Sequence, residues 1–205
     1  MDDSWDIKDA QALFKVLADK AENHRTVAII AGAYMEDYVG RALRLRMPGL
    51  NSAEKQKLFD PSGALGTVSA RIEIAKALRI IDSDTKADLI TIARIRNRFA
   101  HNIHIENFDH EDVAPLCEKL RGGKDIIAGR LANPHLVIDP QPTLTNRERF
   151  YWATTVRGMA LHNQIVSLEH LLREWDSRLA SSEEGDFKEM LKLARSMFRT
   201  VSSGG

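Results

Sequence analysis

Apolar residues recur at spacings of three and four along nearly the whole chain, whereas strict alternation of apolar and polar residues is scarce. A period near 3.6 residues is typical of amphipathic helices, so the pattern predicts an all-α protein. We expect a helical bundle of about six to eight helices. The expected ranges are residues 6–21, 24–47, a short helix ending near 59, then 67–80, 85–100, 109–120, 145–180 and 186–201.

Polar side chains that can cap helices precede several of these ranges. Such residues accept hydrogen bonds from the free backbone N–H groups of the first turn. Glycine and proline are expected at the opposite ends, where Pro48-Gly49 and Gly122-Gly123 stop two helices. The expected caps are Asn23, Asn51 with Glu54, Asp82 or Ser83, and Thr145 with Glu148.

Each long helix has a face of apolar residues that is expected to point into the bundle. In the range 24–47 this face consists of Val27, Ile30, Tyr34, Tyr38, Ala42 and Leu45. The next inward rows are Ile72, Ala75 and Leu78, and then Leu89, Ile92, Ile95 and Phe99. The last is a seam of Leu161, Ile165, Leu168, Leu172, Trp175 and Leu179. Phe150, Trp152 and Trp175 are expected in the core or in a dimer interface.

The spacing of these elements predicts a single all-helical domain over residues 1–205. Its core is expected to cover about residues 5–122, followed by a loop over 123–144 and long C-terminal helices over 145–201. Three prolines lie between residues 131 and 143, where residues 136–138 can form at most one extended strand.

Composition narrows the class of protein. The 205 residues are 43% hydrophobic and 28% charged, which is typical of a globular domain. Lys and Arg number 29, as do Asp and Glu, so no net field attracts the molecule to DNA or to an anionic membrane. Cys117 is the only cysteine, which excludes an intramolecular disulfide and a cysteine-cluster zinc site.

The location expected from these features is cytoplasmic. The first six residues are acidic, unlike the basic start of a secretory signal. The longest apolar run, residues 27–35, is less than half of the roughly 20 residues that cross a bilayer, so no membrane contact is expected.

The strongest candidate for chemistry is the segment 95–102, which contains Arg96, Asn97 and His101. Histidine supplies a base or an acid, and a fixed guanidinium stabilises a pentavalent phosphate, so this set can cleave RNA without a metal. Asn97 and His101 share a helical face, where the amide can orient the imidazole. Arg96 and His101 lie about 140° apart on a helix, so they converge only if the helix loosens or two subunits face each other.

This segment also has a structural interpretation. Arg94, Arg96 and Arg98 favour a helix C-terminus because cations complement the dipole there, and His101 can cap the last carbonyls. The sequence leaves both interpretations open.

Arg96-Asn97 followed by His101 resembles the Arg-polar-x3-His signature of the HEPN superfamily. Members are all-α domains that often form dimeric, metal-independent endoribonucleases. The resemblance implies that Arg96 and His101 are a catalytic pair, that Asn97 is their polar helper, and that no cofactor is needed.

A second resemblance covers residues 58–82, with Gly63-Ala64-Leu65-Gly66 leading into a helix that carries Arg71. This segment looks like the core of the mannitol operon repressor (MtlR) family, and the weaker match extends over residues 25–120. The resemblance implies an all-helical, cytoplasmic, oligomeric protein with no recognisable DNA-reading module. The sequence likewise contains no helix-turn-helix with a basic recognition helix, so no sequence-specific DNA contact is expected.

Other candidate sites favour structural roles. Arg71 and Glu73 can anchor a buried ion pair or bind an anion near Gly63, but no Gly-Lys-Ser/Thr follows, so a structural loop is favoured. His101, His104 and His110 lie near Glu106 without a helical i, i+4 pair, so no metal is expected. Ser62, Thr67 and Ser69 lack the His and Asp neighbours of a hydrolase triad.

Two functions are consistent with these features. The first is a transcription-related regulator that acts through protein contacts and forms a homo-oligomer, with a dimer expected. The second is a HEPN-type endoribonuclease, a toxin or defence effector, that contacts RNA through Arg96 and His101. Whether the protein is an enzyme is left open by the sequence.

Overall fold

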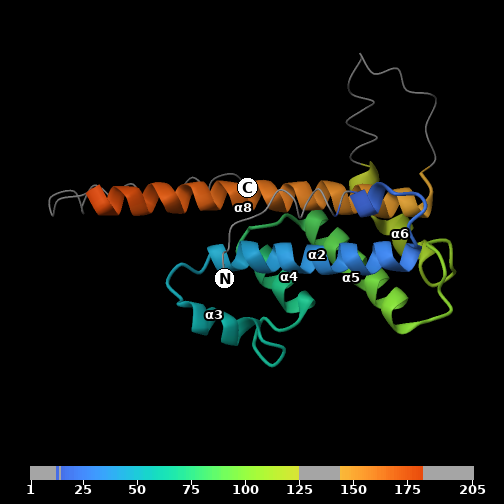
Figure 1. Cartoon of the computed structure of the whole chain (residues 1–205), viewed down its shortest axis with the longest axis horizontal. Helices are drawn as coiled ribbons and strands as arrows, with labels where there is room; N and C mark the ends of the chain where they lie inside the picture. Colours follow the sequence, from blue (N-terminus) through green and yellow to red (C-terminus); the bar gives the residue numbers. More distant parts are fainter. Residues whose placement is uncertain (1–12, 14, 125–143, 182–205) are drawn as a thin grey trace, which may run out of the picture. The chain divides into compact units, whose positions relative to one another are not determined.

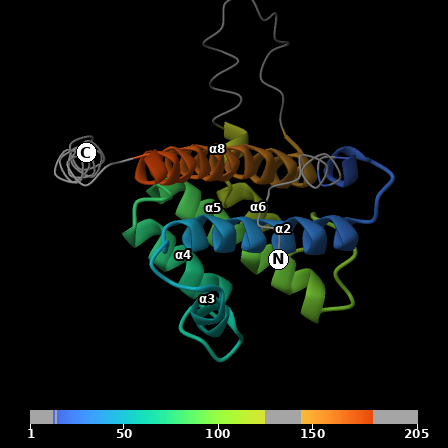
Figure 2. The same cartoon turned by 60° about the vertical axis from the view of Figure 1, so that its left-hand side comes forward.

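The computed structural model describes residue 13, residues 15–124 and residues 144–181. Within these ranges every regular element is an α-helix and no strand occurs, which confirms the all-α class (Figures 1 and 2). Residues 15–18 and 122–124 are also helical. The helices with both ends described are α2 (His24–Leu45), α3 (Ser52–Phe59), α4 (Val68–Ala77), α5 (Ser83–His101), α6 (Ala114–Lys119) and α8 (Asn146–Ser181).

Three expectations lie outside the described residues. They are the first part of the helix over 6–21, the extended segment 136–138 and the last helix over 186–201.

The predicted caps are confirmed at four helix starts. Asn23 Oδ1 accepts from Arg25 N–H at 2.8 Å, and Asp82 Oδ1 accepts from Thr85 N–H at 2.7 Å. Glu54 N–H donates to Asn51 Oδ1 at 3.0 Å, while Asn51 N–H donates to Glu54 Oε2 at 2.9 Å. Thr145 and Glu148 make the same reciprocal pair before α8, at 2.8 and 3.2 Å. These bonds form because they join residues that are neighbours in the sequence.

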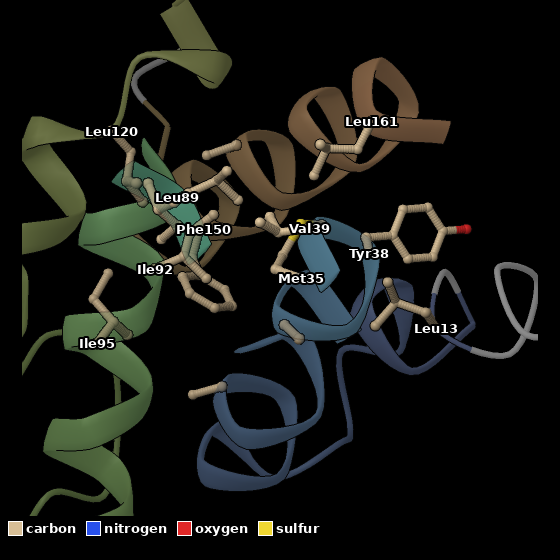
Figure 3. Close-up of a cluster of buried hydrophobic side chains, with 14 of the residues drawn as sticks. Leu13, Met35, Tyr38, Val39, Leu89, Ile92, Ile95, Leu120, Phe150 and Leu161 are labelled. Carbon is tan, nitrogen blue, oxygen red and sulfur yellow. The ribbon is translucent and has the colours of Figure 1, made fainter. Parts of the chain in front are cut away.

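The chain divides into two compact units, residues 1–165 and residues 166–205. The described part of the second unit is the continuation of α8 over residues 166–181. The first unit contains a hydrophobic core to which α2, α4, α5 and the first half of α8 contribute. Figure 3 shows part of this core, with Met35 from α2, Ile92 from α5 and Phe150 from α8 among its side chains. The expected extent of a single domain, 1–205, stays a prediction.

The buried face of α2 includes Val27, Tyr38 and Ala42 as expected but differs at other positions. Ile30 is 39% exposed and Tyr34 is half-buried, whereas Ala28, Ala31 and Val39 are fully buried. Small residues allow the backbone of α2 to approach its neighbours closely, and that close packing selects the face. The clearest case is Gly32, where a Cβ would lie 2.6 Å from Arg96 Cγ of α5.

The expected inward row on α4 is also partly wrong. Ile72 and Ala75 are buried as predicted, but Leu78 is 43% exposed. Leu78 lies four residues after Ile74, which is 38% exposed, so both residues share a face of the helix that points away from the core.

The helix expected over 109–120 begins five residues later, at Ala114. Asn107 Oδ1 accepts from Asp109 N–H at 2.9 Å, and His110 Nδ1 accepts from Asp112 N–H at 3.2 Å. Such local side-chain bonds offer the backbone an alternative to the helix. Gly122-Gly123 was expected only to stop this helix, yet both residues are themselves helical.

Gly122 is required because two helices meet at its backbone. A Cβ there would lie 2.7 Å from the Cα of Ala153 in α8. Asp88 of α5 accepts from Arg121 N–H at 2.8 Å and from Gly122 N–H at 3.0 Å, which caps the new helix. The same carboxylate receives Arg157 Nε of α8 at 2.7 Å, with both side chains at most 8% exposed. A buried charge needs this kind of complete pairing.

Candidate functional site

The candidate residues Arg96, Asn97 and His101 lie in the last turns of α5. The helix is regular through His101, because Asn102 N–H donates to Arg98 O at 3.1 Å. Asn97 and His101 are exposed and Arg96 is half-buried. The predicted site therefore lies at the protein surface.

The Arg96 side chain crosses the surface of α2 at Gly32. Its guanidinium donates to Asn97 Oδ1 at 2.9 Å and lies 3.8 Å from Glu36 Oε2. The Glu36 carboxylate also receives Arg71 Nη1 at 3.2 Å. Glu36 thus lies between two guanidinium groups from α4 and α5, a pairing that the sequence did not indicate.

The single chain does not bring Arg96 and His101 together. Since α5 does not loosen at His101, the two side chains leave the helix about 140° apart. The Asn97 carbonyl is bonded to Arg96, and no hydrogen bond joins Asn97 to His101 among the described residues. Arg96 and His101 can therefore converge only if a second subunit faces this one, because the helix does not loosen.

The C-terminus of α5 is capped by Arg25 from the start of α2. Its guanidinium donates to the carbonyl of Phe99, and to those of Asn102, Ile103 and Ile105 at 3.1, 3.1 and 3.0 Å. The Phe99 carbonyl is one of those that a helix end leaves free, and the other three belong to the chain that follows the helix. Among the described residues, no hydrogen bond joins the exposed His101 side chain to a carbonyl at this helix end, so the capping expected for His101 is not seen.

Buried aromatic residues hold the chain after α5 in place. Phe99 and Phe108 are fully buried with ring centroids 5.1 Å apart, and Phe108 lies 4.9 Å from Phe150. Phe108 N–H donates to His24 Nδ1 at 3.2 Å. Burial and the nearby Arg147 lower the pKa of His24 below its ordinary value, and Asp109 partly opposes this. The neutral imidazole is the form that accepts this bond.

Arg71 has the structural role that was favoured for it. Its Nε donates to Leu65 O at 2.7 Å and its Nη2 to Phe59 O at 3.2 Å, so it holds the loop between α3 and α4. Its ion-pair partner is Glu36, whereas Glu73 pairs with Lys86 at 2.7 Å.

Among the described residues, no other reactive side chain belongs to a further candidate catalytic or metal site. Burial raises the pKa of the Cys117 thiol to about 12, so it stays protonated. Among the described residues, no three His, Cys, Asp or Glu side chains gather where a metal ion could bind. Within the same ranges, no helix combines the length and apolar character of a membrane span.

Sequence reasoning missed Arg25, Glu36, Asp88 and Arg157. All four make contacts between residues at least 35 positions apart, or cap a helix end that lies far away in the sequence. One signal was available for Asp88. Asp88 lies four residues before Ile92 and seven before Ile95, on the apolar face of its helix, where a carboxylate requires a buried partner.

No family model and no curated protein sequence matches the chain. A solved structure is similar, the X-ray structure of the MtlR-HPr complex from Escherichia coli. The match has a TM-score of 0.49 and 16% sequence identity, and it covers 78% of this chain and 97% of that chain. A likeness at this level transfers no residue role to this chain.

Proposed function

We propose that this chain is a regulator that acts through protein contacts. The observation that carries the proposal is an apolar stripe on α4 and the turn after it, inside the segment that resembles the mannitol operon repressor family. Ile74 is 38% exposed and Leu78 is 43% exposed, and Ala77 between them is also exposed. Positions four apart share a helical face, so these side chains form one surface. We call Ile74, Ala77 and Leu78 the α4 stripe.

A protein is the ligand that best fits the α4 stripe. Aliphatic side chains gain free energy when another apolar surface removes them from water, whereas nucleic acid offers mainly phosphates and base edges. The charged neighbours Glu73 and Lys86 are already paired with each other. The stripe therefore has an apolar centre bordered by this ion pair and by Lys76 and Arg79. An apolar centre with a polar rim is typical of protein interfaces.

The test compares proteins recovered with tagged wild type and with Leu78→Asp. We expect a specific protein to bind the wild type in high salt and to be lost in the variant. Met159→Asp is the matched control, since Met159 is 56% exposed on α8 and receives the same change. Equal recovery by all three proteins contradicts the proposal, as does tight, sequence-specific DNA binding by the purified wild type.

A second candidate function is a metal-independent endoribonuclease. The observation that favours it is the exposed His101, whose capping role is taken by Arg25, one turn beyond the bonded pair Arg96 and Asn97. In this mechanism His101 moves the proton of the 2′-hydroxyl or of the leaving oxygen, and Arg96 stabilises the phosphorane. To reach phosphate, Arg96 exchanges its 3.8 Å contact with Glu36 for the substrate.

Total RNA incubated in EDTA tests this second candidate. We expect the wild type to cleave RNA and both His101→Ala and Arg96→Ala to be inactive. His104→Ala is the matched control, because His104 is also exposed and lies outside the motif. Identical RNA profiles for wild type and His101→Ala would contradict the ribonuclease hypothesis and would not affect the regulator hypothesis.

A further inference from the structure

A cavity of about 330 Å³ lies beside α2 and belongs to neither of the proposed functions. Cavities of this size hold small organic ligands in many proteins. Most of its lining comes from α2, and two residues come from the segment that precedes α2; Figure 3 shows one of them, Leu13, near Tyr38. The lining residues are Leu13, Val16, Ile30, Tyr34, Asp37, Tyr38 and Arg41.

Part of this lining is aliphatic. Ile30, which the periodicity of the sequence placed in the core, is 39% exposed and lines the cavity together with Leu13 and Val16. An apolar group that enters the cavity removes these side chains from water, which is favourable. The cavity is therefore suited to a ligand with an apolar part.

An ion pair of α2 forms the charged part of the lining. Arg41 Nε donates to Asp37 Oδ2 at 2.7 Å, and the two side chains are 30% and 50% exposed. Nη1 and Nη2 of Arg41 and Oδ1 of Asp37 have no hydrogen-bond partner among the described residues. The pair therefore keeps donors for an anionic group and an acceptor for a cationic group.

Two tyrosines lie on the same face of α2 as this pair. The Tyr34 hydroxyl donates to the Tyr38 hydroxyl, and the ring centroids are 4.3 Å apart. Tyr38 is 2% exposed, so a polar oxygen lies within a largely apolar lining. Phenol hydroxyls both donate and accept, and aromatic ring faces attract cations. These groups complement a small ligand that carries charge at one end.

We propose that the cavity binds a free α-amino acid with an apolar side chain. The ligand carboxylate accepts from Nη1 and Nη2 of Arg41, and the ligand ammonium group donates to Asp37 Oδ1. The apolar side chain of the ligand packs against Leu13, Val16 and Ile30.

The two signs of the ion pair favour an amino acid over simpler ligands. A carboxylic acid bound to Arg41 would also face Asp37, and an amine bound to Asp37 would also face Arg41, so each is partly repelled. A zwitterion carries both signs on neighbouring atoms and satisfies both side chains. A residue inside a protein chain has neither backbone charge, so a free amino acid fits better than a protein segment.

Isothermal titration calorimetry of the full chain with L-leucine and L-phenylalanine tests the proposal. We expect at least one of them to bind. Its analogue without the ammonium group, 4-methylpentanoate or 3-phenylpropanoate, should bind about tenfold more weakly or less. The same is expected of the analogue without the carboxylate, 3-methylbutylamine or 2-phenylethylamine.

Arg41→Gln and Asp37→Asn test the two charged contacts separately. Each should raise the Kd of the amino acid by about tenfold or more, because each removes a charge-assisted hydrogen bond. Asp37→Asn should also strengthen binding of the analogue without the ammonium group, because its carboxylate no longer faces a like charge. A purely structural ion pair would not produce this reversal. Glu169→Gln is the matched control, since Glu169 forms an ion pair of the same spacing with Arg173 on α8 at 3.5 Å.

Ile30→Ser tests the apolar contact. It should raise the Kd of the amino acid by about fivefold or more while the circular dichroism spectrum and the unfolding midpoint without ligand stay unchanged, because the Ile30 side chain is 39% exposed. Val166→Ser is the matched control, since Val166 is 44% exposed on α8 and should not affect binding.

Three results would overturn the proposal. They are no binding of either amino acid at about 10 mM, an equal Kd for an amino acid and its two analogues, and unchanged binding by Arg41→Gln. A preference of the wild type for the analogue without the ammonium group would assign the cavity to carboxylic acids instead. All of these measurements use the purified protein without RNA or a protein partner, so they are independent of both proposed functions.

Discussion

Charged side chains in the two halves of helix α5 differ in burial and in pairing. In the first half Asp88 is fully buried, and its two oxygens accept from two backbone N–H groups and from Arg157. In the second half Arg94, Arg98 and His101 are exposed and have no described partners. Complete pairing is characteristic of a group that holds elements together, whereas unpaired surface charge is available to a ligand or partner. The comparison assigns a stabilising role to Asp88, whereas Arg94 and Arg98 have no stabilising ion pair among the described residues.

The largest effect is expected from Asp88→Ala, which leaves Arg157 buried opposite an empty position. Removing one partner of a buried pair costs about 3–5 kcal/mol in the free energy of unfolding. Urea denaturation of the purified variant measures this loss. The double variant Asp88→Leu with Arg157→Leu should be more stable than Asp88→Ala, because no uncompensated charge is left. A loss below about 1 kcal/mol in Asp88→Ala would contradict the structural assignment.

A smaller effect is expected from the glycines that lie beside the two halves. Gly122→Ala places a Cβ 2.7 Å from backbone of α8, which cannot yield without moving the helix. We expect a loss of about 1–3 kcal/mol in the free energy of unfolding. Gly32→Ala places a Cβ 2.6 Å from Arg96 Cγ and 2.7 Å from Arg96 Cβ. Because Cβ is fixed to the backbone of α5, this change also requires a shift between helices and should cost a similar amount. Thermal unfolding of both variants measures these losses, and a loss below about 0.5 kcal/mol in either variant would contradict the close helix contact at that glycine.

A pH-dependent effect is expected from His24, which holds the chain after α5. The pKa of His24 in the folded state lies below the ordinary 6.5. Between this lowered pKa and pH 6.5 the unfolded chain therefore binds more protons than the folded chain. The stability from this group is fully present above pH 6.5 and is lost as pH falls through the lowered pKa. Urea unfolding at a series of pH values measures the loss. His24→Asn should flatten the curve in this window, and an unchanged curve would exclude His24 as its source.

The smallest effect is expected from Arg94→Ala and Arg98→Ala. Both side chains are exposed and unpaired among the described residues, so each change should alter the free energy of unfolding by less than about 0.5 kcal/mol. The same chemical denaturation used for Asp88 measures it. A loss comparable to that of Asp88→Ala would show that these two arginines also stabilise the fold.

Much of the fold could be predicted because it depends on neighbours in the sequence. The caps at Asn51, Asp82 and Thr145 bind backbone groups within three residues, so their spacing was sufficient. The start of α6 was missed because Asn107 and His110 make equally local bonds that compete with the helix. Periodicity alone cannot weigh those two outcomes against each other.

The candidate site was predicted less completely. The position of Arg96, Asn97 and His101 late in a helix followed from the pattern, but the capping role considered for His101 did not hold. At the end of α5 the guanidinium of Arg25 binds Asn102 O instead, although Arg25 lies 77 positions earlier in the sequence. Such contacts leave no periodic signal along the chain.

The sequence by itself determined that the chain is helical, where several helices begin, and that one helix ends in a polar cluster, since these properties arise from local spacing and local hydrogen bonds. Only the tertiary structure decided which face of α2 is buried, what Asp88 binds, and that Arg25 caps the end of α5. Those outcomes depend on packing between distant segments, where the size of a residue such as Gly32 matters as much as its polarity.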